Sequence, residues 1–193
     1  MWEILSHPGG WPKKLQVYYD RKRELATQRK LIQQKTTELG PEHPQVLDAR
    51  ESYTLALMAD HQFAKAEAEW KSILLIRNRV VDPEHVSSPN GLELLAYIYM
   101  EERKYDQAEV LHRIILKASE RVDGTQAEMT IIRVDALAYC LMKQGKREEA
   151  ISYAQRAVDG YRQLLGTNDI KRSRHEEIIT DSERLLEDLQ RKK

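Results

Sequence analysis

The chain repeats itself with a period of 42 residues, and this period limits the fold more than any other feature of the sequence. Alanine recurs at positions 66, 108 and 150, within the similar segments HQFAKAEAEW, RKYDQAEVLH and GKREEAISYA. Several unlike positions come into register at once, which is the signature of a repeat protein. Each repeat is therefore expected to be one structural unit that buries its apolar face against its neighbours.

Two helical stretches are expected in each repeat. Residues of high helix propensity (Leu, Ala, Glu, Gln, Lys and Arg) dominate the sequence, and apolar residues such as Tyr53 and Leu57 keep helical spacing. We predict an antiparallel pair, with the first helix called A and the second called B. The A helices are expected at about 44–59, 87–101 and 126–143, and the B helices at about 62–80, 104–121 and 146–164.

The stretch LGPEHP, residues 39–44, is interpreted as the joint between repeats, with relatives beginning at 81, 123 and 165. Pro44 fits the first turn of a helix, where its missing N–H is not needed. Gly40, Gly124 and Gly166 lie where a helix C-terminus favours a residue that can adopt positive φ. The loop therefore looks structural, and His43 and His85 within it are expected to shape the loop rather than to bind metal.

The sequence predicts an all-α fold of about eight helices in one repeat domain. This domain would span 13–193, after an N-terminal tail of residues 1–12. Its three full repeats are expected at about 39–80, 81–122 and 123–164. Single helices at 13–38 and 171–191 are expected to cap the two ends, because an uncovered terminal repeat would expose its apolar face.

The composition narrows the class of protein. With 31 basic and 31 acidic residues the chain has no net charge, so nucleic acid is not an expected partner. The single cysteine, Cys140, excludes an intramolecular disulfide and suits a reducing compartment. No apolar run approaches the roughly 20 residues of a membrane span. We expect a soluble, cytoplasmic protein without a membrane partner.

The second repeat carries the motif most clearly, from Leu95-Ala96 to Tyr99 and from Lys104-Tyr105 to Ala108-Glu109. This order resembles the tetratricopeptide repeat, and the 42-residue period with its LGPEHP linker is similar to the kinesin-light-chain type of that repeat. The resemblance covers about 24–191. It implies a right-handed α-solenoid that acts as a protein-interaction scaffold, with the A helices lining a concave groove that holds the ligand.

The A-helix positions not needed for packing repeat regularly, and they are the predicted ligand groove. One position of each A helix is acidic, and these residues form an acidic ladder: Glu51, Glu93, Asp135 and Glu177. One turn further along each helix lies a Leu/Tyr strip (Leu55, Tyr97, Tyr139), which is followed by a methionine strip (Met58, Met100, Met142). The last helix has the polar residues Asp181 and Arg184 at these two positions. The predicted groove residues are Glu51, Leu55, Met58, Glu93, Tyr97, Met100, Asp135, Tyr139, Met142, Glu177, Asp181 and Arg184.

This groove would suit a basic ligand with apolar groups, because tyrosine faces attract cations and methionine surfaces adapt to different partners. Kinesin light chains usually carry asparagine at or beside the acidic position, so the acids here favour a basic peptide over an acidic one. The alternative is structural: the acids favour the N-terminal half of each A helix, and the methionines pack between repeats.

Other candidate residues have simpler interpretations. His112 is expected to pack between helices, and Cys140 to be a buried, inert thiol. The basic runs RKRE at 21–24 and KRSR at 171–174 are expected to be solvated helix faces, with nucleic-acid contact as the alternative. No metal site, cofactor or catalytic residue is predicted.

The tail contains Trp2 and Trp11 around a His-Pro-Gly-Gly turn. Large aromatic side chains in a tail usually dock on another surface. They are expected either to cover the first cap helix or to occupy a groove of the same or a neighbouring molecule, in which case the tail would mediate self-inhibition or dimerisation.

Three functions follow from the sequence. We expect a non-enzymatic adaptor that holds a peptide or partner helix, and reversing the charge of Glu93 and Asp135 to Lys should weaken binding with little effect on the melting temperature. The first alternative is an enzyme that uses the groove as an acid- and tyrosine-lined chamber for cyclisation or proton transfer. The second is a homo-oligomeric assembly module, in contact through the tail or the end caps.

Overall fold

The computed structural model describes residues 13–80 and 89–165, together with positions 180, 183, 184, 187 and 191. All elements in these residues are α-helices, which confirms the predicted all-α fold. The chain divides into two compact units, Met1–Val86 and Ser87–Lys193, and each is described by itself. The prediction of one repeat domain over 13–193 stays a prediction.

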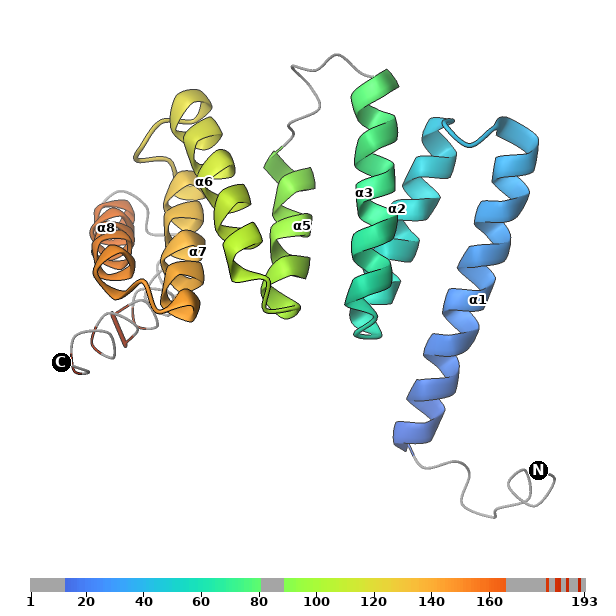
Figure 1. The fold of residues 1–193 in the computed structure, drawn as a ribbon, viewed down its shortest axis with the longest axis horizontal. Helices are drawn as coiled ribbons and strands as arrows, with labels where there is room; N and C mark the ends of the chain where they lie inside the picture. The colour runs from blue at the N-terminus through green and yellow to red at the C-terminus, as the bar shows by residue number, and fades with distance from the viewer. Residues whose placement is uncertain are drawn as a thin grey trace. The chain divides into compact units, whose positions relative to one another are not determined.

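The first unit contains three described helices, and consecutive helices pack against each other. They are α1 (Lys13–Leu39), α2 (Pro44–Ala59) and α3 (Phe63–Val80), labelled in Figure 1. Helix α1 is the expected N-terminal cap, α2 is an A helix and α3 is a B helix. In this unit α2 packs against both of the others.

The second unit contains two A/B pairs that again pack in consecutive order. Its helices are α5 (Pro89–Glu101), α6 (Tyr105–Val122), α7 (Glu128–Gln144) and α8 (Arg147–Leu165), seen in Figure 1. The observed bounds of the seven helices in 13–80 and 89–165 lie within one turn of the predicted ones. The predicted cap helix at 171–191 lies almost entirely outside the described residues.

The joint between repeats has the geometry expected from its sequence. His43 is the N-cap of α2, and its Nδ1 accepts a hydrogen bond of 3.3 Å from the backbone N–H of Gln45. Pro44 occupies the first turn. Gly40 and Gly124 have φ values of +87° and +91°, so both use the left-handed conformation predicted for them. Gly166 lies outside the described residues.

The turn from each A helix to its B helix also needs the left-handed region, which was not predicted. His61, Arg103 and Gly145 follow one another at the 42-residue spacing and have φ values of 56°, 59° and 78°. Only the third of these positions carries glycine, the residue for which this conformation is not strained. The backbone repeats here although the side chains do not.

The core lies between the A and B helices. The repeated alanines Ala66, Ala108 and Ala150 are fully buried, which allows each B helix to approach its neighbours closely. Cys140 is also fully buried, and its Sγ lies 3.5 Å from the backbone oxygen of Tyr105. Burial raises the pKa of this thiol, as expected for an inert cysteine.

None of the helices in the described part of the chain has the length and apolar character that a membrane span requires.

Candidate functional site

The middle strip of the predicted groove lies at the surface of the A helices. Leu55 on α2, Tyr97 on α5 and Tyr139 on α7 are 53%, 50% and 46% exposed. The residues beside them are buried: Ile98 and Cys140 are fully covered. The strip therefore contributes little to the core, and in the second unit it presents two tyrosines from two A helices.

The first residue of the acidic ladder forms an ion pair with a residue of a B helix, which the sequence pattern did not indicate. Glu51 forms an ion pair with Arg77 of α3. Burial raises the pKa of Glu51, although Arg77 counteracts part of this effect. Position 77 corresponds to 119 and 161 in the next repeats, where serine and tyrosine stand instead.

Glu93 is paired by a different route. Its Oε1 accepts a hydrogen bond of 2.8 Å from Nε of Arg133, which belongs to α7, the next A helix. Arg133 is only 8% exposed, and its Nη1 donates to Ser119 Oγ at 2.6 Å and to Asp123 Oδ2 at 3.3 Å. Two residues of the ladder, Glu51 and Glu93, are thus neutralised by arginines from two different kinds of helix.

Asp135, the third described residue of the ladder, lies near the buried Tyr161 of α8. Burial raises the pKa of Tyr161, and the charges of Asp135 and Glu128 raise it further. Tyr161 stands at the position that Arg77 occupies in the first repeat, so the residue that pairs with Glu51 is replaced by tyrosine beside Asp135.

The two tyrosines differ in their neighbours. Burial raises the pKa of Tyr97, and the charge of Glu101 and a hydrogen bond to that carboxylate add to the shift. The ring of Tyr139 has Lys143 Nζ 4.9 Å from its centroid, so its face already attracts a cation of the chain itself. A basic ligand would compete with Lys143 for this ring.

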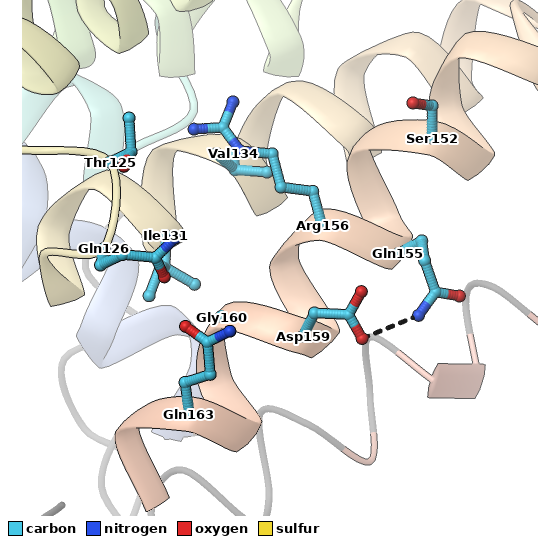
Figure 2. A pocket seen from close by; sticks show the side chains of 10 residues that line it. All are labelled: Thr125, Gln126, Ile131, Val134, Ser152, Gln155, Arg156, Asp159, Gly160 and Gln163. Carbon is cyan, nitrogen blue, oxygen red and sulfur yellow. Dashed lines mark hydrogen bonds between the residues drawn. The ribbon is translucent and has the colours of Figure 1, made fainter.

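The second unit also has a cavity of about 320 Å³ that includes none of the predicted groove residues. Ile131 and Val134 of α7 line it together with polar side chains of α8 and of the turn before α7, and Figure 2 shows the hydrogen bond from Gln155 to Asp159. Arg156 at this cavity is paired with Glu120 at 2.6 Å. The cavity has no tyrosine in its lining, so it is not the acid- and tyrosine-lined chamber of the enzyme hypothesis.

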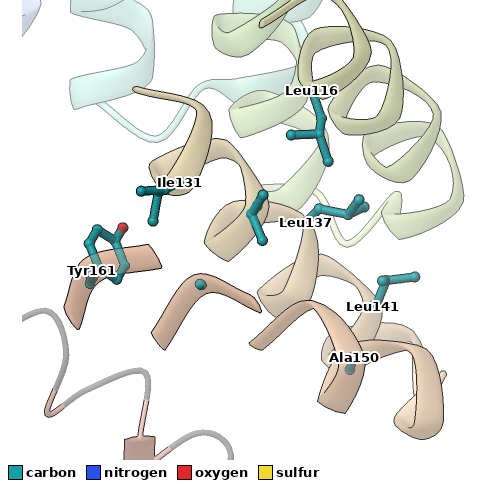
Figure 3. Close-up of a cluster of buried hydrophobic side chains, with 8 residues drawn as sticks. Leu116, Ile131, Leu137, Leu141, Ala150 and Tyr161 are labelled. Carbon is teal, nitrogen blue, oxygen red and sulfur yellow. The ribbon is translucent and has the colours of Figure 1, made fainter. Parts of the chain in front are cut away.

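The methionine strip is half-buried. Met58, Met100 and Met142 all have intermediate exposure. Met142 packs against the buried cluster of the second unit, to which Leu137 and Leu141 of the same helix belong (Figure 3). Met142 therefore has a packing role, whatever else it contacts. Met129, at the start of α7, is 46% exposed and was not predicted, because its position carries no methionine in the other repeats.

The remaining predicted residues are placed as follows. Arg184 is helical and exposed. Glu177, Asp181, Trp2 and Trp11 lie outside the described residues. Among the residues that the structure describes, no cluster of three or more His, Cys, Asp or Glu side chains could hold a metal ion.

His112 packs near the Glu93 carboxylate. Burial lowers the pKa of its imidazole, and the charge of Glu93 offsets part of this shift. The neutral imidazole is therefore favoured beside the Glu93–Arg133 pair, in keeping with the predicted position between helices.

Comparison with known proteins gives a family match over part of the chain. Residues 88–163 match the family model described as tetratricopeptide repeat. None of the curated protein sequences compared with the chain matches it.

Solved structures extend the likeness to most of the chain. The kinesin-light-chain-like, nearly identical TPR-like repeats of a Podosopora anserina protein give a TM-score of 0.68 at 16% identity, over 92% of this chain and 89% of that one. A single-substitution variant of that protein gives the same TM-score at 18% identity and the same coverage. BtubC, also named BKLC, from P. vanneervenii gives 0.59 at 16% identity, over 88% and 70% of the two chains. At these identities the likeness shows the fold.

Proposed function

We propose that this chain, whose residues 88–163 match the tetratricopeptide repeat model and whose fold is similar to kinesin-light-chain-like repeats, is a protein-interaction scaffold that binds a peptide or a partner helix. The binding site is the A-helix surface of the second unit. We define the A-helix surface by the exposed or half-exposed residues of α5 and α7, namely Tyr97, Met100, Met129, Asp135 and Tyr139.

The exposure of Tyr97 and Tyr139 is the observation that carries the proposal. Both side chains are about half exposed to solvent, and they occupy equivalent positions of two A helices in one compact unit. Tyrosine is among the residues that dominate binding energy at protein interfaces, since it offers a large contact area with few rotatable bonds. The Glu93–Arg133 pair joins α5 to α7, so the two rings are presented by helices that are tied together.

The charge of the surface favours a ligand with basic residues. Asp135 and Glu101 lie four residues from Tyr139 and Tyr97 on the same helices, so both acids flank the tyrosine strip. A ligand cation would meet Asp135 or the tyrosine faces, and it would displace Lys143 from the ring of Tyr139. We therefore assign the basic preference to the two acids that flank the tyrosine strip, Asp135 and Glu101.

The proposal is tested with peptides selected by phage display on the full chain. The tightest peptide is synthesised, and its dissociation constant is measured for the wild type and for the double variant Tyr97→Ala/Tyr139→Ala. We expect affinity to fall by about tenfold or more, because truncating a central interface tyrosine typically costs at least that factor. The melting temperature should change little, since both rings are half-exposed.

Tyr18→Ala is the matched control, because Tyr18 is 50% exposed but belongs to the first unit. Unchanged affinity in the double variant, or an equal loss in the control, would remove the A-helix surface as the binding site. A selected peptide without basic residues would contradict the charge preference alone.

A further inference from the structure

Helix α1 carries a concentration of positive charge that the neutral chain as a whole does not show. Its sequence contains eight Lys or Arg residues and three Asp or Glu residues, whereas the full chain has 31 of each kind. The charge is therefore segregated along the sequence, because α1 has five more basic than acidic residues in a chain that is neutral as a whole. Such segregation produces a local field that can select a partner of opposite charge.

The aromatic and basic residues of α1 form two adjacent stripes. Each stripe has a tyrosine, a basic residue four positions later and another basic residue seven positions after that. These spacings return to nearly the same side of a helix with 3.6 residues per turn. The two stripes are Tyr18, Lys22, Arg29 and Tyr19, Arg23, Lys30.

The stripes are exposed within the first unit. Tyr18 and Tyr19 are 50% and 49% exposed, and their rings meet edge to face at a centroid distance of 5.4 Å. The side chains of Arg23, Arg29 and Lys30 are exposed and make no hydrogen bond or ion pair with any residue that the structure describes.

The packing face of α1 borders the first stripe and lies opposite the second. Leu25 comes seven residues after Tyr18, so it shares the side of the helix that carries Tyr18 and Arg29. Leu25 is buried, and α2 is the helix of this unit against which α1 packs. Arg21 Nη1 donates to the backbone oxygen of Ala59 at 3.0 Å, and Lys22 Nζ lies 3.1 Å from Asp60 Oδ2. These contacts fix α1 on the end of α2 and already engage Lys22 of the first stripe, whereas the second stripe lies on the side that α2 does not cover.

We propose that the second stripe of α1 and the exposed residues beside it form a second docking surface, which binds an acidic helix of a partner protein. This surface consists of Tyr18, Tyr19, Arg23, Arg29 and Lys30. Arg23 and Lys30 stand seven residues apart, so carboxylates seven residues apart on a partner helix would face them in register. The tyrosines would supply the apolar contact, because tyrosine and arginine are the residues enriched at interface hot spots.

The charge pattern favours an acidic protein over nucleic acid or an anionic membrane. Asp20 and Glu24 lie on the same helix, and the chain has no net charge to attract a phosphate polymer from a distance. A short helix with spaced carboxylates can meet Arg23 and Lys30 and avoid these acids. The surface is independent of the A-helix surface, so the scaffold would bridge an acidic partner on α1 and a basic partner on α5 and α7.

The test uses the full chain and a synthetic helical peptide with glutamates seven residues apart. Its affinity is measured by fluorescence anisotropy at two salt concentrations, next to a peptide of the same composition in scrambled order. We expect the ordered peptide to bind more tightly, and we expect the double variant Arg23→Glu/Lys30→Glu to bind it at least about tenfold more weakly. The variant Tyr18→Ala/Tyr19→Ala should also bind more weakly, with less change in the salt dependence.

Lys117→Glu/Arg121→Glu is the matched control, since it reverses two exposed charges on α6. Its affinity should stay close to that of wild type, and circular dichroism melting confirms that each variant is folded. The proposal is overturned if the ordered peptide does not bind, if the scrambled peptide binds equally well, or if the control loses as much affinity as the α1 variant. Tighter binding of a 20-base-pair DNA or of phosphatidylserine vesicles through the same residues would overturn the assignment to a protein partner.

The proposal for the A-helix surface and the proposal for α1 can be tested independently of each other. Tyr97→Ala/Tyr139→Ala should retain the acidic peptide, and Arg23→Glu/Lys30→Glu should retain the basic peptide selected on the A-helix surface. Loss of one interaction therefore leaves the other intact.

Discussion

The Nε atom of Arg133 on α7 lies 2.8 Å from Oε1 of Glu93 on α5, and this pair connects the two helices that present Tyr139 and Tyr97. The guanidinium also reaches Ser119 Oγ, which shares a hydrogen bond of 2.8 Å with Thr130 Oγ1. A residue of the predicted ligand groove is therefore part of the internal structure of the second unit, and Arg133 controls how much of its charge remains for a ligand.

Replacing Arg133 by Met should destabilise the protein, because Glu93 would lose its partner and Ser119 one of its hydrogen bonds. The loss is expected to be about 2 kcal/mol, below the cost of breaking a fully buried pair, because the Glu93 side chain is 36% exposed. Urea denaturation measures the change. Lys117→Met, at an exposed position of α6, is the control and should have a much smaller effect.

The same pair revises the expectation for charge reversal at Glu93. The sequence alone treats Glu93→Lys as a surface change with little effect on the melting temperature. In the structure the new lysine would face Arg133, so we expect a lower melting temperature as well as altered binding. A melting temperature equal to that of wild type would show that the pair does not contribute to stability.

The Glu109 carboxylate should make part of the free energy of unfolding depend on pH in the acid range. Burial by itself raises the pKa of its carboxyl, but hydrogen bonds from Lys146, Gln144 and Arg113 outweigh it and lower the pKa from 4.5 to about 2. Since the folded pKa is depressed, the contribution is complete above pH 4.5 and is lost as the pH falls towards about 2.

Glu109→Gln should therefore lower stability at pH 7 by about 2 kcal/mol, the range for a hydrogen bond to a charged group. The difference from wild type should shrink between pH 4.5 and about 2, as followed by thermal melts across this range. Glu148→Gln changes an exposed acid of the same unit and serves as the control. A difference that stays constant over the acid range would contradict the assignment of the charge to Glu109.

Gly160 allows α8 to approach α7, and alanine should not fit there. A Cβ atom at this position would lie 2.8 Å from Cγ1 and 2.9 Å from Cδ1 of Ile131. Alanine gains up to about 1 kcal/mol of helix propensity, but overpacking typically costs about 1–3 kcal/mol, so Gly160→Ala should be destabilising overall.

A double-mutant cycle separates the clash from other effects. Ile131→Ala removes the atoms that the new methyl group would meet, although it also leaves a cavity. The two substitutions in combination should cost less than the sum of the single losses, by about 1 kcal/mol in denaturation experiments. Strict additivity would mean that the helices already have room at Gly160.

The turn between A and B helices should tolerate glycine better than the residues found there in two repeats. Arg103 has φ at 59°, a conformation that is strained for a residue with a side chain, whereas the equivalent Gly145 has φ at 78° without strain. Arg103→Gly should raise the melting temperature slightly, and Gly145→Ala should destabilise by about 1 kcal/mol. The opposite pair of signs would refute the assigned backbone geometry.

The sequence by itself determined the helices and the repeat. The spacing of Ala66, Ala108 and Ala150 fixed the register, and the prolines and glycines of the joints fixed where helices begin and end, because these are local preferences of the backbone. Tyr97 and Tyr139 could be assigned to the surface of the A helices for the same reason, since a 42-residue period fixes which side of each helix a residue occupies.

Only the tertiary structure decided what the charged residues do. The acidic ladder is regular in the sequence, yet Glu51 pairs with Arg77 of its own repeat and Glu93 with Arg133 of the next one. Arg133 has no equivalent in the other repeats, so periodicity could not reveal it; its place between the buried Ile131 and Val134 was the one available signal. A long, flexible arginine side chain can reach several acids, and which one it meets depends on how the helices pack rather than on its position in the repeat.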